Sequence, residues 1–99
     1  MPINIYVEDS REELDWLCEG VWELSNQIEA LEIWLDSKGK NLDPNKYVAD
    51  IGFDIRSDAT GGGGVLKSNS MKIMGAIGMD LYFSEYPSSN ERIDIHDHE

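Results

Sequence analysis

Residues 10–39 read SREELDWLCEGVWELSNQIEALEIWLDSKG. Apolar side chains recur in this stretch at alternating spacings of three and four residues, the heptad pattern of a helix with one apolar stripe. The stripe consists of Leu14, Leu17, Val21, Leu24, Ile28, Leu31 and Leu35. Ser10 and Glu13 have the spacing of a capping box, and Lys38 followed by Gly39 is typical of a helix end. The pattern predicts one long helix from residue 11 to residue 37.

Gly20 lies inside this predicted helix and weakens it. A glycine in a helix interior costs about 1 kcal/mol relative to alanine, so a bend or a break at Gly20 is compatible with the pattern. The stripe has two possible uses, because it can pack on a sheet of the same chain or pair with a second copy as a coiled coil. Acidic side chains beside the stripe would repel each other across such a dimer. We therefore expect packing within one domain, and a monomer rather than a homodimer.

Three segments alternate apolar and polar side chains with the period of two that is typical of a half-buried strand. They span residues 3–7, 49–55 and 79–83. Pro87 lies just beyond the last of these segments and is expected to end it. A shorter helix that carries Met71, Met74 and Ile77 is expected before the last strand, with Gly78 at its C-terminal end.

The expected order of elements is strand, long helix, strand, short helix, strand. Helices that alternate with strands bury their apolar faces against one side of a sheet. We expect an α+β two-layer sandwich, with both helices packed on one face of a small sheet and a single domain over residues 1–87. Residues 88–99 are expected to form a polar, acidic C-terminal tail.

Acidic residues dominate the composition. Twenty Asp and Glu oppose eight Lys and Arg among 99 residues, which gives a formal net charge of -12. Eight of the acids lie between residues 11 and 36, where Arg11 is the only basic residue. A field of this sign attracts basic surfaces and repels nucleic acid and anionic membranes. We therefore expect a basic protein partner, with no direct contact to nucleic acid or to a membrane.

Cysteine usage and hydropathy indicate the compartment. Cys18 is the single cysteine, so no internal disulfide can form, and a domain held by packing alone is typical of a reducing compartment. No apolar run approaches the length of about 18 residues that a membrane span needs, and the first residues lack the pattern of a signal peptide. We expect a cytoplasmic protein in which Cys18 is a packing residue rather than a nucleophile.

Acidic and aromatic side chains would share the surface of the long helix that faces away from the stripe. These are Glu12, Asp15, Trp16, Glu19, Trp22 and Glu23. The polar face of the second strand would extend the same negative field through Asp50 and Asp54. One interpretation is a solvated face with indoles partly covered by connecting segments. The other is a partner-binding site, in which tryptophans supply contact area and carboxylates steer a basic protein.

No segment carries a catalytic motif, and we expect neither a cofactor nor a metal. Residues 61–68 approach the pattern of a phosphate-binding loop, but Leu66 takes the place of its second glycine and would block close approach of a phosphate, so a mobile linker is expected. Potential metal ligands gather at the C-terminus, namely Asp94, His96, Asp97, His98 and Glu99. A polar terminal segment more often frays than holds an ion.

A small acidic α+β domain with an indole-bearing acidic helix resembles the immunity proteins of bacterial toxin systems. The residues that carry the resemblance are Glu12, Asp15, Trp16, Glu19, Trp22 and Glu23. It implies a protein that is not an enzyme and that neutralises a cognate basic toxin, such as a nuclease, by stoichiometric binding. Two alternatives are a phage-type inhibitor that mimics nucleic acid to block a defence nuclease, and a homodimeric helical scaffold.

Overall fold

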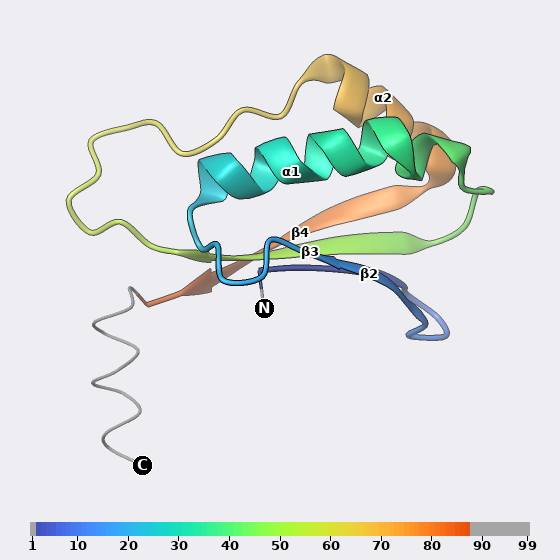
Figure 1. Cartoon of the computed structure of the whole chain (residues 1–99), viewed down its shortest axis with the longest axis horizontal. Helices are drawn as coiled ribbons and strands as arrows, with labels where there is room; N and C mark the ends of the chain where they lie inside the picture. Colours follow the sequence, from blue (N-terminus) through green and yellow to red (C-terminus); the bar gives the residue numbers. More distant parts are fainter. Residues whose placement is uncertain (1, 88–99) are drawn as a thin grey trace, which may run out of the picture.

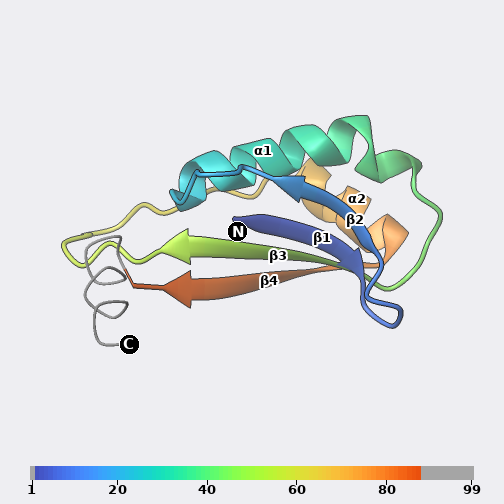
Figure 2. The same cartoon turned by 60° about the horizontal axis from the view of Figure 1, so that its bottom comes forward.

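A mixed sheet organises the fold. The structure, a computed structural model, describes residues 2–87. Its strands are β1 (Ile3–Val7), β2 (Glu13–Leu17), β3 (Tyr47–Asp54) and β4 (Met79–Tyr86). They lie in the order β2-β1-β3-β4, as Figure 2 shows. β1 is antiparallel to both of its neighbours, whereas β3 and β4 run parallel and are joined through a helix. The three predicted strands are confirmed, and β2 is an additional one.

Both helices cover one face of this sheet (Figure 1). They are α1 (Leu24–Ser37) and α2 (Ser68–Ile77), and a short 3-10 turn, η1 (Gly39–Asn41), follows α1. Within residues 2–87, the opposite face of the sheet carries no helix. The prediction of a small α+β fold with helices on one face of a sheet is therefore confirmed, although the element order differs from the predicted one.

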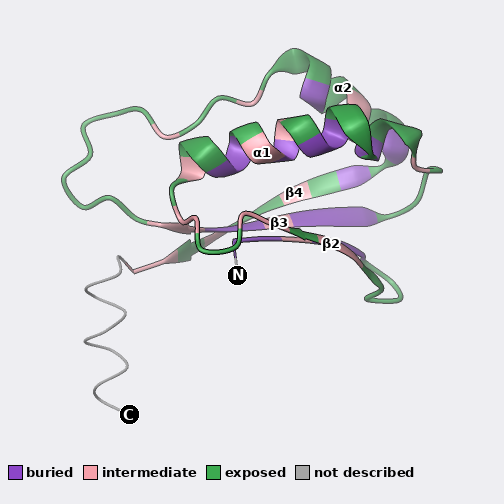
Figure 3. Cartoon of the chain, viewed as in Figure 1, coloured by how far each residue is buried: buried purple, intermediate pink, exposed green. Residues whose placement is uncertain are grey.

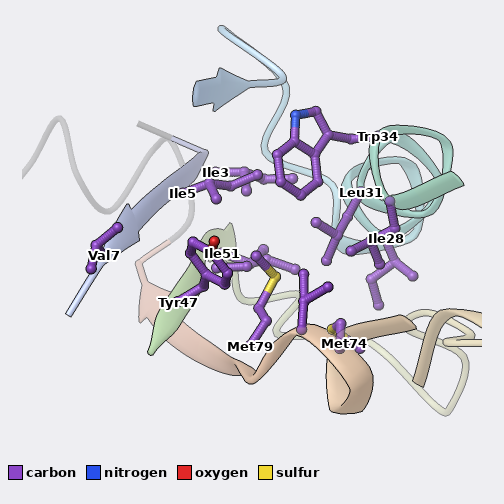
Figure 4. Packing of buried hydrophobic residues seen from close by; sticks show 13 residues of the cluster. Ile3, Ile5, Val7, Ile28, Leu31, Trp34, Tyr47, Ile51, Met74 and Met79 are labelled. Atoms are coloured by element: carbon purple, nitrogen blue, oxygen red, sulfur yellow. The ribbon is translucent and has the colours of Figure 1, made fainter. Parts of the chain in front are cut away.

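The hydrophobic core lies between α1 and the sheet (Figure 4). The buried side of α1 consists of Gln27, Ile28, Leu31, Trp34 and Leu35, and three of these, Ile28, Leu31 and Leu35, belong to the predicted stripe. Leu31 and Leu35 are fully buried, and burial of each such side chain stabilises the fold by about 1.5–3 kcal/mol. They pack with Ile3, Ile5 and Ile51 from the two central strands, which Figure 3 shows as the most buried part of the sheet.

The prediction of one long helix is wrong for its first half. Residues 13–17 form β2 and pair antiparallel with β1, and α1 begins only at Leu24. The Ser10 hydroxyl accepts the backbone N–H of Glu12 at 3.3 Å, inside the hairpin that joins the two strands, so the predicted capping box does not form. As a strand, this segment satisfies backbone groups along the free side of β1, which a helix would leave unpaired.

Left-handed backbone conformations prevent this segment from being helical. Arg11 and Cys18 both have φ of 61°, and Gly20 has φ of 80°. Residues in this region cannot continue a right-handed helix. Arg11 and Cys18 bracket β2, and Gly20 lies in the turn that leads to α1. Gly20 is therefore part of a complete break between a strand and a helix, rather than a bend within one helix.

Asp15 attaches β2 to α1. One of its carboxylate oxygens accepts the indole N–H of Trp34 at 2.9 Å and lies 3.4 Å from the Lys38 ammonium. The other oxygen accepts the backbone N–H of Trp16 at 2.9 Å. Partial burial of the carboxyl would raise its pKa, but the hydrogen bonds from Trp34 and Trp16 and the nearby Lys38 charge outweigh this effect and lower the pKa. Asp15 is thus held as a carboxylate.

Helix α2 is fixed at both ends by other parts of the chain. The Glu32 carboxylate, from α1, accepts the backbone N–H of Lys67 at 2.7 Å and the Ser70 hydroxyl at 2.8 Å. These two hydrogen bonds, led by the one from Lys67, lower the pKa of Glu32. At the other end Gly78 has φ of 86°, and a Cβ there would collide with the backbone carbonyl of Asn45. The predicted glycine stop is confirmed.

None of the helices within residues 2–87 is long and apolar enough to cross a membrane. The predicted tail over residues 88–99, with its potential metal ligands, lies outside the described residues. Within residues 2–87, no group of three or more His, Cys, Asp or Glu side chains is placed to hold a metal ion.

Candidate protein-binding face

The helix-free face of the sheet is formed by alternate residues of its four strands. Ile3, Ile5, Ala49 and Ile51 point into the core on the helix side. Because successive side chains of a strand point to opposite faces, the intervening residues point away from the helices. We call this surface the open face. Its strand residues are Asn4, Tyr6, Glu13, Trp16, Val48, Asp50, Gly52, Asp54, Asp80, Tyr82, Ser84 and Tyr86.

Two rows of side chains cross the open face from β2 to β4. Directly paired residues place Trp16, Asn4, Asp50 and Tyr82 in the first row. The second row consists of Glu13, Tyr6, Val48 and Asp80. Each row therefore combines carboxylates with aromatic rings, and the strands contribute no lysine or arginine to either row.

Asn4 occupies the middle of the first row, between Trp16 and Asp50. Its side-chain oxygen is buried and has no hydrogen-bond partner among the described residues. The surrounding basin has a volume of about 270 Å³ and is lined by Asn4, Tyr6, Arg11, Glu13 and Asp50. The two carboxylates of this lining, Glu13 and Asp50, outnumber its one cation, Arg11, so the basin favours a ligand that donates hydrogen bonds and carries positive charge.

Arg11 is the basic residue among those that line this basin. It comes from the β1–β2 hairpin, and its guanidinium carbon lies 5.5 Å from the centroid of the Tyr6 ring, a cation–π contact. Arg11 adopts a left-handed backbone conformation, which is uncommon for a residue with a side chain. The chain therefore already places one cation on an aromatic ring of the open face.

Hydrogen bonds hold several open-face groups in position. The Trp16 indole donates to the Glu13 carboxylate, and the Ser84 hydroxyl donates to the Asp50 carboxylate at 2.7 Å. The Tyr82 hydroxyl lies 3.2 Å from the Glu8 carboxylate, which raises the pKa of the tyrosine. Trp16 and Tyr82 remain 40% and 41% exposed, so large aromatic surfaces at both ends of the first row are open to a partner.

The predicted partner-binding residues do not share one helix face. Trp16, Asp50 and Asp54 lie together on the open face, whereas Asp15 points to the opposite side of β2, where it binds Trp34. Glu12 and Glu19 lie in the connecting turns and are exposed. The predicted helical surface is wrong because these residues belong to a hairpin, a strand and a turn.

Trp22 and Glu23 lie where the chain passes from β2 to α1. The Trp22 carbonyl accepts the backbone N–H of Asp54 at 3.0 Å, and its ring packs edge-to-face on Tyr86 with 5.7 Å between centroids. Both residues line a second hollow, of about 260 Å³, between the start of α1 and the end of β3. Trp22 thus adjoins one end of the open face, while Glu23 belongs to the α1 terminus.

The segment that approaches a phosphate-binding loop carries no anion site. The N-terminus of α2, where a phosphate would bind, already receives the Glu32 carboxylate through Lys67 and Ser70. Glu29 and Glu32 line the hollow beside the glycines, and carboxylates there would repel a phosphate. Cys18 is partly buried, which raises the pKa of its thiol and lowers its reactivity.

Sequence reasoning missed Asn4, Tyr6, Glu13, Asp80 and Tyr82 as members of the candidate site. The alternation in residues 3–7 and 79–83 already put Tyr6, Asp80 and Tyr82 on the polar sides of their strands. Glu13 could not be placed, because its segment was predicted as a helix. The strand order, which brings these residues together, has no signal in the sequence.

Comparison with known proteins adds no relative, because no protein-family model, curated protein or solved structure matches the chain. The chain is thus characterised by its own geometry. It has a small α+β fold with one helix-covered sheet face and one open face that combines carboxylates, exposed aromatic rings and an unpaired amide oxygen.

Proposed function

We propose that this chain is a non-catalytic binding protein whose open face takes a basic protein partner. The observation that carries the proposal is the pair of rows on the sheet, which combine the carboxylates of Glu13, Asp50 and Asp80 with the exposed aromatic rings of Trp16 and Tyr82. Aromatic side chains dominate the energetics of protein interfaces, and carboxylates around them steer a basic partner and raise its association rate.

The basin indicates which group of the partner would enter it. A lysine ammonium or an arginine guanidinium donates several hydrogen bonds and is positively charged, so it matches the carboxylates of Glu13 and Asp50 that line the basin. The neighbouring contact of Arg11 with Tyr6 shows that a guanidinium fits against this aromatic surface.

In its specific form, the proposal is that the chain is a cytoplasmic immunity protein that neutralises a basic toxin by covering its active site. A nuclease is a suitable partner, because a cleft that binds a polyanionic substrate also attracts a carboxylate-rich surface. Association would be fast and sensitive to salt, since surface charges steer the encounter and are screened at high ionic strength.

Quantitative affinity capture from a lysate of the source organism tests the proposal. The test variant is Glu13→Lys/Asp50→Lys, and the matched control is Glu29→Lys/Asp36→Lys, which changes the net charge equally on exposed positions of α1. We expect a basic protein to be recovered by the wild type and the control and lost with the test variant. Its association rate with the test variant should fall by about tenfold or more. Equal recovery with both variants, each shown to be folded by circular dichroism, would contradict the proposal.

A further inference from the structure

Strand β4 forms one edge of the sheet and has no neighbouring strand on its outer side within residues 2–87 (Figure 2). It is eight residues long, Met79–Tyr86, compared with five residues for β2 at the other edge. A long edge strand presents a row of unpaired N–H and C=O groups that can pair with another extended chain. β4 is thus the larger of the two edges available for strand addition.

The hydrogen bonds of β3 identify the backbone groups of β4 that point outward. The backbone N–H of Ile55 donates to the carbonyl of Tyr86 at 3.1 Å, so Tyr86 points its backbone groups toward β3. Successive residues of a strand direct these groups alternately to its two sides. The N–H and C=O groups of Leu81, Phe83 and Glu85 therefore point away from the sheet.

Side chains along this edge favour a particular kind of partner. Tyr82 on the open face and Phe83 on the helix side are adjacent, and they are 41% and 53% exposed. Asp80 and Glu85 flank this pair, also on opposite faces, and β4 contains no basic residue. A strand that pairs here would meet apolar surface at its centre and negative charge near both ends.

A second copy of the chain is a poor match for this edge. Antiparallel pairing of two β4 strands would bring together two edges that each carry Asp80 and Glu85 and no basic residue. The net charge of -12 per chain adds long-range repulsion between the two copies. Charge complementarity instead favours a basic strand.

We propose that β4 accepts an extended segment of the basic partner as an additional antiparallel strand. This inference rests on the proposed function, because it takes the partner to be basic. It assigns a sequence pattern to the added segment, with Lys or Arg opposite Asp80 and Glu85 and bulky apolar residues opposite Tyr82 and Phe83. The main-chain hydrogen bonds of Leu81, Phe83 and Glu85 supply affinity, and the side-chain pattern supplies specificity.

The probe for this surface is the capped peptide Thr-Arg-Thr-Val-Ile-Thr-Arg-Thr, which carries the pattern in the antiparallel register. Its control is the same peptide with Glu in place of both Arg residues. We expect the Arg peptide to shift the amide NMR signals of Leu81, Phe83 and Glu85 and the Glu peptide to leave them unchanged. Unshifted signals with the Arg peptide at millimolar concentration would overturn the proposal.

Two variants at one position separate backbone pairing from side-chain contact. Phe83→Ala and Phe83→Pro both remove the ring, but only the proline removes the outward N–H, a change that edge strands tolerate. We expect the proline variant to bind the Arg peptide about tenfold more weakly than the alanine variant, the equivalent of one hydrogen bond. Equal affinities for two variants shown to be folded would contradict strand addition. Glu85→Lys gives an independent check, because it should weaken binding of the Arg peptide and strengthen binding of the Glu peptide.

The failure of this inference is distinguishable from the failure of the proposed function. A natural partner that depends on Trp16 and Asp50 but binds the Phe83→Ala and Phe83→Pro variants equally would refute strand addition and leave the open face as the binding surface. Protection of the Phe83 amide from hydrogen exchange in the free protein would also refute it. Loss of that protection on dilution would assign the edge to a second copy, and loss on deletion of residues 88–99 would assign it to the chain's own C-terminal segment.

Discussion

The hydrogen bond between Asp15 and Trp34 should contribute a measurable part of the stability, because it is the side-chain link between β2 and α1. The Trp34 ring is 6% exposed, and its indole N–H lies 2.9 Å from the Asp15 carboxylate. Asp15→Ala leaves this donor without its acceptor. A hydrogen bond to a charged group contributes about 1.5–3 kcal/mol, and the exposed Lys38 pair adds at most a few tenths.

We therefore expect Asp15→Ala to lower the free energy of unfolding by about 2–3 kcal/mol, which corresponds to a fall in Tm of roughly 8–24 °C in a domain of this size. Asp15→Asn retains an acceptor without its charge and should lose about half as much. Urea titration followed by far-UV circular dichroism measures the loss independently of tryptophan fluorescence. Asp36→Ala, at an exposed position of α1, is the control and should change the stability by less than about 0.5 kcal/mol.

A double-mutant cycle isolates the interaction from the other effects of each substitution. Trp34→Phe removes the donor and some packing, and the double variant with Asp15→Ala removes both partners. We expect a coupling energy of about 1–2 kcal/mol between the two positions. Additive losses, with a coupling energy below about 0.3 kcal/mol, would refute the reasoning, because they would show that Asp15 and Trp34 act on stability independently.

Three further predictions concern α2 and acid stability. Glu32→Ala removes the acceptor at the start of α2 and should cost about 1 kcal/mol in urea titration, so an unchanged midpoint would show that this contact is dispensable. Gly78→Ala should lower the free energy of unfolding by more than about 2 kcal/mol, because it combines a left-handed φ with a collision at the Asn45 carbonyl. Gly75→Ala, at an open position within α2, should raise the free energy of unfolding by about 0.5–1 kcal/mol. The reverse order of stabilities would contradict the geometry. Since the pKa values of Asp15 and Glu32 are lowered by folding, their contribution is complete above about pH 5 and is lost as the pH falls below about 4. Urea midpoints across this range should fall less for a variant that lacks both carboxyls.

The elements that were predicted correctly from the sequence are those whose pattern of apolar residues fits only one type of secondary structure. Alternation in residues 3–7 and 79–83 fits a strand and nothing else, and the stripe from Leu24 to Leu35 is long enough to define a helix. Gly78 follows the last apolar residue of α2, where a left-handed glycine is expected.

The segment around β2 could not be predicted, because its pattern is ambiguous. Leu14, Leu17 and Val21 have helical spacing, but so few residues cannot exclude a short strand followed by a turn. The left-handed conformations of Arg11 and Cys18 leave no trace in the sequence, since side chains rarely favour them. Gly20 was the one available sign of the break. The pairing of this segment with β1 depends on contacts that form only in the folded chain.

The sequence predicted that acidic and aromatic residues form the candidate site, but it did not predict where in the fold these residues lie. Trp16 and Asp50 were assigned to different elements, a helix and a strand, and the structure brings them into one row with Asn4 between them. That arrangement requires β1 to lie between β2 and β3, which no local pattern encodes. Asp15 and Trp16 are adjacent in sequence, and strand geometry sends their side chains to opposite faces.

The central position of β1 also has a consequence for how the chain folds. β1 reaches β2 through a short hairpin, but it reaches β3 only after α1 has been formed or passed, because β3 lies near the middle of the chain. Pairings between distant segments slow folding, since loop-closure entropy must be overcome before they form. We therefore expect the hairpin and α1 to form early and the β1–β3 pairing to limit the rate. Until β3 arrives, the apolar side of β1 is exposed, so the nascent chain is most prone to aggregation during the synthesis of α1.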